Sequence, residues 1–381
     1  MTNDGNAGSG SFKSAQSPSP LMGHPSLGMR YCLVLFLTLL LGTQVRADSA
    51  RRQQHGNLMS RSTRQSIDNG LEFLARHQNR NGSWTDLVGR KVHFRYVGYA
   101  ADHVGVTALA GMAFLANGSV PGRGKYADTV SRALNYILEH TGSEGFISAH
   151  RSRMYSHAFA TVFLAEIYGM TQDRKVREKL KLAVRLIVRA QNKEGGWRYL
   201  PGAEDSDMSI TVCQVMGLRA ARNAGIQVPK RSIGEATDYV KRSYRADVSA
   251  FTYQVEDNYL RAQSRHSFAL TACGVATLYG AGDYDAFQID EALRYMVERR
   301  PRAVEAAQSF DYFYGHYYAA QAAFQKGGSY WSSWYRTIQS EFVLLQESDG
   351  SWKDLVGKNY ATAMACIVLQ IPFQYLPITE R

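Results

Sequence analysis

The stretch Leu71-Glu72-Phe73-Leu74-Ala75-Arg76-His77-Gln78-Asn79-Arg80-Asn81-Gly82-Ser83-Trp84 decides the fold, because its closing phrase occurs twice more in the chain. The later copies are Gln191-Asn192-Lys193-Glu194-Gly195-Gly196-Trp197 and Gln346-Glu347-Ser348-Asp349-Gly350-Ser351-Trp352. Each copy indicates an amphipathic helix that ends near Gln, followed by a glycine turn and a tryptophan. We expect the Trp to pack between neighbouring repeats, while the Gln amide bonds to exposed backbone groups there.

Weaker copies of the same unit fill the spaces between these three. They are the helical patterns near 134–140 (followed by Gly145-Phe146), 236–244 and 289–299. Each of the six is followed by a helix that is apolar on most faces, and such a helix is expected to be buried. These six segments are 103–116, 157–170, 208–224, 266–279, 316–325 and 360–371. The sequence therefore predicts an all-α fold of about six pairs, each with an outer and an inner helix.

The first and last repeats resemble each other beyond the tryptophan. Gly82-Ser83-Trp84-Thr85-Asp86-Leu87-Val88-Gly89 matches Gly350-Ser351-Trp352-Lys353-Asp354-Leu355-Val356-Gly357. An open solenoid usually needs atypical repeats that cap its ends, so similar end repeats favour a closed ring. We expect residues 62–381 to form one ring-shaped domain.

The N-terminal segment predicts export. Residues 1–28 are polar and aperiodic, and Met29-Arg30 then precedes an apolar run over 31–41. Val45 and Ala47 occupy the two small-residue positions of a cleavage site. We therefore predict a disordered leader and cleavable signal peptide over 1–47, a true start at Met29, and a linker over 48–61. An uncleaved N-terminal membrane anchor is the alternative, although the apolar run is short for a membrane span.

Composition excludes some classes of function. The 381 residues carry a formal net charge of +11, but the Lys and Arg residues are scattered and form no dense block interleaved with aromatics. We therefore expect no nucleic-acid partner. Cys213, Cys273 and Cys366 lie in apolar helical stretches and are expected to be buried free thiols. The sequence contains no phosphate-binding loop or serine nucleophile elbow.

The Gln–Gly–Trp phrase, the helix-pair repeat and the count of six resemble the superfamily of squalene–hopene cyclases and protein prenyltransferase β-subunits. The resemblance covers roughly residues 62–372 and implies a single α6–α6 toroid. The chain has the length of one such barrel, whereas triterpene cyclases resemble two in tandem. Fold alone does not fix activity, so the chemistry must be argued from residues.

Polar residues recur four positions before an aligned small or β-branched residue of each inner helix. They are His103, His157, Asp207, His266, His316 and Lys358. In a ring, these positions would face one another around the rim of a central cavity. Tyr314 and Tyr317 belong to an aromatic cluster at the fifth inner helix, and we expect them at the same rim.

The prenyltransferase resemblance implies a zinc site at this rim. Asp205-Ser206-Asp207 resembles the Asp-x-Cys part of the family's ligand set, with Asp in place of Cys, and His266 and His316 both resemble its His. A metal site at Asp207, His266 and His316 is therefore one hypothesis. Capping of helix starts by the same side chains is the other. Zinc is the one cofactor that the sequence suggests.

The cyclase resemblance implies acid chemistry instead. The family's Asp-x-Asp-Asp-Thr motif is similar to Asp205-Ser206-Asp207-Met208-Ser209, in which Met208 replaces the last Asp. The middle Asp, which donates the starting proton in the family, corresponds to Asp207, with Asp205 beside it. Losing one carboxyl weakens a device that needs close carboxyl groups. Helix capping is again the alternative.

Two functions stay open from sequence. The first is an exported toroid, similar to a cyclase or prenyltransferase, that acts on or binds an isoprenoid or other apolar ligand in its central cavity. The second is a binding or scaffold protein that keeps the toroid without the chemistry. A peripheral contact with a membrane fits either one, and the need for a partner subunit is undecided.

Overall fold

Twelve helices in the described part of the chain alternate between an outer and an inner layer. The computed structural model describes residues 58–92, 95–255, 265–306 and 311–376. The outer helices are α2 (Arg61–Arg76), α4 (Ala127–Glu139), α6 (Arg174–Ala190), α8 (Lys230–Arg242), α10 (Gln288–Glu298) and α12 (Gly328–Leu345). The inner helices are α3 (Val104–Ala116), α5 (Met154–Thr171), α7 (Met208–Asn223), α9 (Phe268–Ala281), α11 (Tyr312–Lys326) and α13 (Lys358–Gln370). The predicted signal peptide and residues 48–57 of the predicted linker lie outside the described residues.

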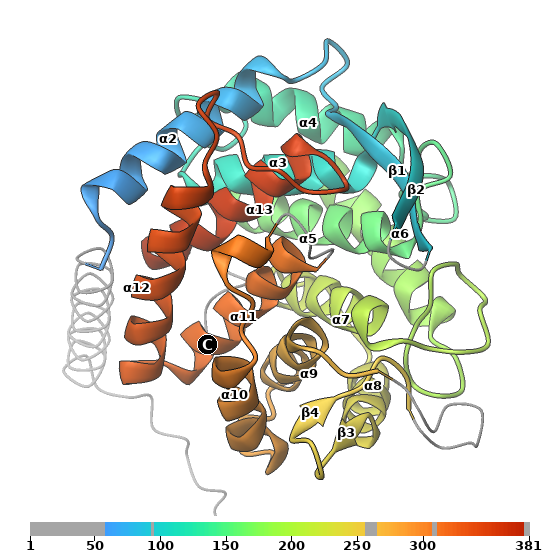
Figure 1. Cartoon of the computed structure of the whole chain (residues 1–381). Helices are drawn as coiled ribbons and strands as arrows, with labels where there is room; N and C mark the ends of the chain where they lie inside the picture. Colours follow the sequence, from blue (N-terminus) through green and yellow to red (C-terminus); the bar gives the residue numbers. More distant parts are fainter. Residues whose placement is uncertain (1–57, 93–94, 256–264, 307–310, 377–381) are drawn as a thin grey trace, which may run out of the picture. The chain divides into compact units, whose positions relative to one another are not determined.

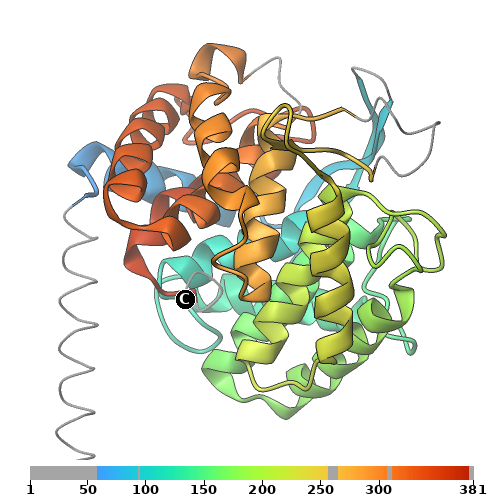
Figure 2. The same ribbon diagram turned by 90° about the horizontal axis from the view of Figure 1, so that it is seen from below.

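The inner helices close into a ring. Each packs against the next in the order α3, α5, α7, α9, α11 and α13, and α13 packs against α3. Figure 1 shows the six inner helices around a common axis, with the outer helices outside them. Figure 2 shows the helices of the ring lying side by side. The predicted α6–α6 toroid is confirmed. No helix in the described part of the chain is long and apolar enough to cross a membrane.

The glutamine of the repeated phrase joins neighbouring repeats. Gln191 donates through Nε2 to the carbonyl of Gly195 (2.7 Å) in its own turn and to that of Ser232 (2.8 Å) in α8. Gln78 bonds in the same way to Gly82 and to Thr129 in α4. Gln346 bonds to Gly350 and to Ser66 in α2, so the last repeat is joined to the first. The glutamine of the phrase therefore stabilises the turn of its own repeat and also joins that repeat to the next one, including where the ring closes.

The tryptophan of the phrase is buried and fully bonded. Trp197 is 0% exposed, and its Nε1 donates to the carbonyl of Ile187 at 2.8 Å. Its backbone N–H donates to the hydroxyl of Thr211 in the following inner helix at 3.2 Å. Trp84 and Trp352 repeat this pattern with Thr107 and Thr362. Each tryptophan thus fixes an outer helix to its inner partner.

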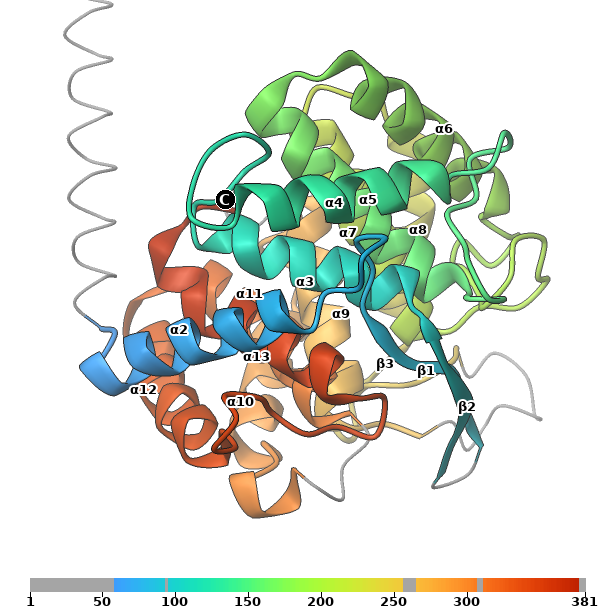
Figure 3. The same ribbon diagram turned by 90° about the horizontal axis from the view of Figure 1, so that it is seen from above.

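A β-hairpin, which the sequence analysis did not predict, follows the first tryptophan. Strands β1 (Thr85–Val92) and β2 (Arg95–Asp102) pair antiparallel, and Figure 3 shows the hairpin projecting from the helical ring. Gly89 and Gly98 face each other in the ladder, where a side chain on Gly89 would overlap the carbonyl of Val97. The short strands β3 (Tyr244–Arg245) and β4 (Ala250–Phe251) and the 3₁₀ turns η2 (Ala303–Glu305) and η3 (Ile371–Phe373) complete the described elements.

Candidate functional site

The inner helices begin at one end of the ring, which we call the mouth. Backbone bonds link their starts to the loops of the next pair: Met154 N donates to Tyr199 O (3.0 Å), and Met208 N donates to Tyr253 O (2.8 Å). The residues that precede the six inner helices surround the mouth. They are His103, Arg153, Asp207, Ser267, Asp311 and Gly357.

Two of the predicted rim histidines, His157 and His316, lie inside their helices, at the place where the other inner helices carry a buried threonine. Thr107, Thr211 and Thr271 each accept a hydrogen bond from the backbone of the preceding turn. In the second repeat, Nδ1 of His157 takes this role by accepting from Ile147 N at 3.2 Å. The fourth or fifth residue of every inner helix is 0% exposed, and the six are Thr107, His157, Thr211, Thr271, His316 and Thr362. His157 and His316 thus replace a buried threonine, and the prediction that they line the rim is wrong.

The environments of these two histidines support that conclusion. His157 packs against Phe146, and His316 is surrounded by Phe268, Tyr312 and other aromatic rings, including two from α12. Burial lowers the pKa of each imidazole to about 3, so both are neutral at pH 7.

The other two histidines lie at helix starts. His103 is partly exposed and caps α3 by accepting through Nδ1 from Gly105 N and Val106 N. Burial lowers its pKa to about 4, as this acceptor role requires. His266 precedes the cap Ser267, and its Nδ1 lies 2.9 Å from the hydroxyl of Tyr295 on the outer helix α10. His103 therefore lies at the mouth, whereas the imidazole of His266 contacts an outer helix and is directed away from the axis of the ring.

The predicted metal ligands do not converge. Asp207 caps α7, His266 bonds to α10, and His316 is enclosed by aromatic rings. Among the described residues, no three His, Cys, Asp or Glu side chains lie where they could hold one metal ion. Lys358, the last of the predicted rim groups, forms an ion pair with Asp349 at 2.6 Å on the exposed surface.

Asp207 is fully buried, and both of its carboxyl oxygens are bonded. Oδ1 accepts from the hydroxyl of Ser209 (2.6 Å) and from Ile210 N (2.9 Å). Oδ2 accepts from the hydroxyl of Tyr253 (3.3 Å) and lies 3.4 Å from Nη1 of Arg198. Burial raises the pKa of Asp207, while these donors act in the opposite direction. Asp207 therefore caps α7, which was the alternative considered from sequence. Its other carboxyl oxygen also contacts Arg198 and Tyr253.

Asp205 lies beside Asp207 but in more open surroundings. Its Oδ2 is 3.5 Å from Nε of Arg198 and accepts from Nε2 of Gln254 at 3.2 Å. One guanidinium therefore bridges the two predicted catalytic carboxyl groups. The structure brings Asp205 and Asp207 together at Arg198.

Aromatic side chains meet across the ring just below the mouth. Tyr155 on α5 packs edge-on against Tyr314 on α11 with ring centroids 6.0 Å apart, and Phe159 packs against Tyr317 in the same way. Tyr314 also donates to the backbone oxygen of Ser209 on α7 at 2.6 Å. Tyr314 is partly exposed, as a rim residue should be, whereas Tyr317 is only 4% exposed. These contacts fill the axis of the ring at the level of Phe159 and Tyr317.

A second group of carboxyls lies where the last repeat meets the first, and we call this side of the mouth the seam. Asp86 in β1 accepts from the backbone N–H of Tyr360 at 2.7 Å and is 9% exposed. Asp354 is partly exposed, and its Oδ1 accepts from Val356 N at 2.9 Å. The pKa of each carboxyl is raised to about 7, mainly by burial, and the charge of Asp311 contributes to the rise at Asp354.

The seam carboxyls were not predicted, although the sequence contains a signal for them. Asp86 and Asp354 hold the same place in the matching phrases of the first and last repeats. Backbone pairing of Leu87 N with Val356 O (3.0 Å) brings the two phrases together at the closure. Asp311 was missed because the fifth inner helix was aligned on His316 rather than on its true start.

Several mouth tyrosines are partly exposed and yet poorly solvated. Tyr155, Tyr314 and Tyr360 keep partial exposure, while burial raises the pKa of each phenol well above its ordinary value of 10. This combination is expected where the surrounding protein covers most of a side chain and leaves a small part of it open to water. The mouth therefore offers charged and phenolic groups in poorly solvated surroundings, which suits acid–base chemistry.

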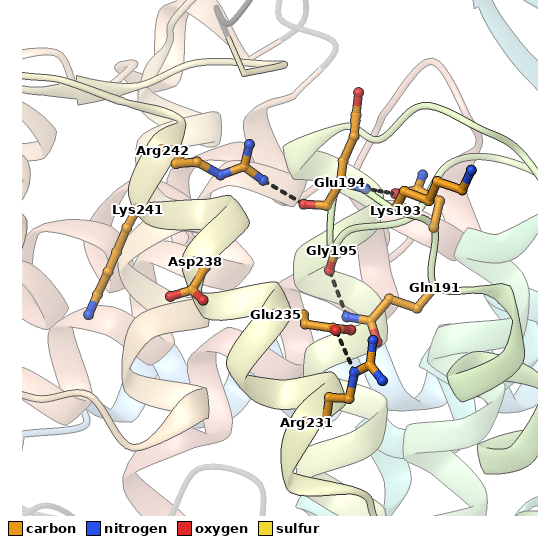
Figure 4. A pocket seen from close by; sticks show the side chains of 10 residues that line it. Gln191, Lys193, Glu194, Gly195, Arg231, Glu235, Asp238, Lys241 and Arg242 are labelled. Carbon is orange, nitrogen blue, oxygen red and sulfur yellow. Dashed lines mark hydrogen bonds and ion pairs between the residues drawn. The ribbon is translucent and has the colours of Figure 1, made fainter.

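A groove of about 850 Å³ lies outside the mouth, between the turn after α6 and helix α8 (Figure 4). Some of its charged groups are used within its own walls, since Arg231 pairs with Glu235 and Arg242 donates to the backbone oxygen of Glu194, while Lys241 pairs with Asp283 outside the groove. The carboxylate of Glu194 accepts from Ser206 N at 2.8 Å and so supports the loop that carries Asp205 and Asp207. We assign the groove a structural part and place the candidate site at the mouth.

Comparison with known proteins supports the fold. No protein-family model matches the chain, and no curated protein matches it in sequence. The type II terpene cyclase MstE from Scytonema, solved with geranylgeranyl dihydroxybenzoate, is similar over 83% of this chain and 98% of its own, with 12% identity and a TM-score of 0.56. An α-1,6-mannanase from Salegentibacter, solved with α-1,6-mannotriose, is similar over 82% and 99%, with 8% identity and a TM-score of 0.59. The chain thus shares its toroid with the cyclase-like proteins it resembles and with glycoside hydrolases.

Proposed function

We propose that the chain is a glycoside hydrolase that acts at the mouth of the ring, with Asp354 as its general acid. The observation that carries this proposal is the position of Asp354. Its carboxyl is partly exposed, and its pKa is raised to about 7, mainly by burial. It also lies close enough to Asp311 for the negative charge of that residue to help raise the pKa.

Glycoside hydrolysis needs two carboxyl groups in different protonation states. One must hold a proton near neutral pH and give it to the glycosidic oxygen, and the other must be ionised to act as base or nucleophile. Burial supplies the first condition at Asp354, because desolvation disfavours its charged form. Asp311, at the start of α11, is the neighbouring carboxyl that we assign to the second role.

A polar substrate suits the lining of the mouth. Arg198, Gln254 and Asp205 offer hydrogen-bonding groups, and partly exposed tyrosines offer flat faces. The contact of Phe159 with Tyr317 fills the axis below them and favours a ligand held at the mouth over one threaded deep into the ring. Similarity to mannanases supports a saccharide, and the predicted signal peptide suits a substrate outside the cytoplasm.

The test is hydrolysis of a panel of neutral and acidic polysaccharides, α-1,6-mannan among them, followed as released reducing ends. We expect Asp354→Asn to lower kcat by about 100-fold or more, which is typical for loss of a general acid. The matched control is Asp128→Asn on the exposed face of α4, which removes the same charge far from the mouth. The activity of the wild type should fall as pH rises above about 7, because Asp354 then loses the proton that it must donate. A fully active Asp354→Asn variant would refute the assignment.

A second candidate is action on an isoprenoid, with Asp207 as acid. The observation that favours it is the raised pKa of Asp207 beside the aromatic faces of Tyr155, Tyr199 and Tyr253, together with similarity to a terpene cyclase. Against it, Asp207 is 0% exposed and its two oxygens already accept four contacts.

Turnover of an isoprenoid such as geranylgeranyl dihydroxybenzoate separates the two candidates. Product formation that is abolished by Asp207→Asn and unaffected by Asp354→Asn would favour the second. Retention of the isoprenoid without product, by wild type and variants alike, would instead indicate the binding protein that the sequence left open.

A further inference from the structure

The mouth carries three arginines around two tyrosines on the side opposite the seam carboxyls. The guanidinium of Arg198 lies 4.9 Å from the ring centroid of Tyr199 and 5.5 Å from that of Tyr253. Arg265 lies 4.5 Å from the Tyr253 ring, and Arg153 lies 5.7 Å from the Tyr199 ring. The five side chains therefore alternate as Arg153, Tyr199, Arg198, Tyr253 and Arg265, and we call them the arginine–tyrosine cluster.

Hydrogen bonds and ion pairs to Asp205 and Asp207 hold the centre of the cluster in place. The phenol oxygens of Tyr199 and Tyr253 are 2.5 Å apart, and Tyr253 donates onward to Asp207. Tyr199 must then donate to Tyr253, so both phenol protons are used inside the protein. Arg198 is fixed by Asp205 and Asp207 and is only 23% exposed. The remaining hydrogen-bond donors of the cluster belong to the guanidiniums, and among them Nη1 of Arg198 is buried with no hydrogen-bond partner in the described part of the chain.

The charges of the cluster do not balance. Asp205 and Asp207 both face Arg198. Within the part of the chain that the structure describes, neither Arg153 nor Arg265 has an acidic side chain within ion-pair distance. Arg153 is partly exposed and Arg265 is exposed. Among the described residues, three guanidiniums thus face two carboxylates, and any protonation of buried Asp207 increases the excess of positive charge.

We propose that the arginine–tyrosine cluster binds an oxyanion on the ligand, so that the substrate is an acidic saccharide bearing sulfate, phosphate or carboxylate groups. Guanidinium groups match the geometry of oxyanions and offer paired N–H donors. Stacking on tyrosine rings restricts these side chains, which lowers the entropy lost on binding. The identity of the carrier as a saccharide rests on the proposed function, whereas oxyanion binding does not.

Titration with inorganic sulfate and phosphate at constant ionic strength tests the site, with binding followed by calorimetry on the full chain. We expect the double variant Arg153→Gln/Arg265→Gln to weaken binding at least tenfold. The control is Arg185→Gln/Arg336→Gln, which removes the same charge from exposed faces of α6 and α12. Equal affinity in wild type and mouth variant, or equal loss in both double variants, would overturn the proposal.

A second arm identifies the carrier. Binding of sulfated, uronate-containing and neutral oligosaccharides of matched length should favour an acidic one, and the mouth double variant should remove that preference. Preference for the neutral oligosaccharide would overturn the proposal. Asp354→Asn separates this result from the proposed function, because it should keep oxyanion binding while losing hydrolysis. Oxyanion binding without hydrolysis of any acidic polysaccharide would count against the hydrolase alone.

Discussion

The two sides of the mouth both bury carboxyl groups, but only one side gives a buried carboxyl a cationic partner. On the arginine–tyrosine side, the buried Asp207 has an arginine and three hydrogen-bond donors. At the seam, Asp86 and Asp354 are desolvated, and each has its pKa raised to about 7 with no arginine or lysine among the causes that act on it. A paired carboxylate is suited to hold other groups in place. A carboxyl that keeps its proton near pH 7 is suited to transfer it.

The difference follows from how the ring closes. On the arginine–tyrosine side, Arg198 and Asp207 come from one continuous loop between α6 and α7 of a single repeat. At the seam, the two ends of the chain meet, and each brings the same phrase with an aspartate at the same place. Repetition of the sequence phrase therefore places two aspartates together at the closure of the ring.

The largest expected effect comes from breaking the seam sterically. A side chain at Gly357 would overlap the carboxyl of Asp86, which is itself held by Tyr360 N, and Gly357 has a φ of +154°. We expect Gly357→Ala to lower the free energy of unfolding by about 3 kcal/mol, the sum of overpacking and an unfavourable backbone conformation.

The matched control for this variant lies on the other side of the mouth. Gly202 has a φ of +82°, but no atom lies within 4 Å of a Cβ built on it. Gly202→Ala should therefore cost only about 1 kcal/mol, from the backbone alone. Urea unfolding of both variants measures the difference. Equal losses would show that the contact of Gly357 with Asp86 does not constrain the closure.

The second effect is a pH dependence of stability that belongs to Asp86. Its folded pKa of about 7 exceeds its ordinary value of 3.8, so the folded chain keeps a proton that the unfolded chain releases between these values. Stability from this group is therefore present below about pH 4, falls as pH rises to 7, and then stays low. We expect Asp86→Asn to match the wild type at pH 4 and to exceed it by about 2 kcal/mol at pH 8, roughly half of what a shift of three units allows.

Urea titrations at pH 4, 6 and 8 measure this difference, and comparison with the wild type removes the contributions of the buried histidines. Asp128→Asn again controls for the loss of a charge. A constant difference between Asp86→Asn and wild type at all three pH values would contradict the raised pKa.

The periodic part of the molecule was predictable, and the irregular part was not. Burial of one helix face and the repeated Gln–Gly–Trp phrase are local signals, so the helix pairs and the ring followed from sequence. The N-terminal ends of α5 and α11 were placed three or four residues late, because His157 and His316 were read as rim groups. A histidine can replace a buried threonine as a hydrogen-bond acceptor, and no local pattern distinguishes that role from capping.

The site itself depended on contacts between distant segments. Asp205 and Asp207 were found because a motif places them in one loop. The pairing of Asp86 with the start of α13 spans the whole domain and requires the ring to be closed first. Arg153 and Arg265 were missed for the same reason, since their tyrosine partners lie in other loops of the mouth.

The smallest expected effect tests whether stacking or the phenol hydroxyl holds the arginine–tyrosine cluster. Tyr253→Phe removes the bonds to Tyr199 and Asp207 but keeps the ring beneath Arg198 and Arg265. We expect a loss of about 1 kcal/mol in the free energy of unfolding, as for one partly exposed hydrogen bond, and unchanged affinity for sulfate. Tyr284→Phe, at a tyrosine that is 40% exposed, should change neither quantity. If Tyr253→Phe loses sulfate binding as completely as the arginine variants, the hydroxyl rather than the ring face positions the guanidiniums.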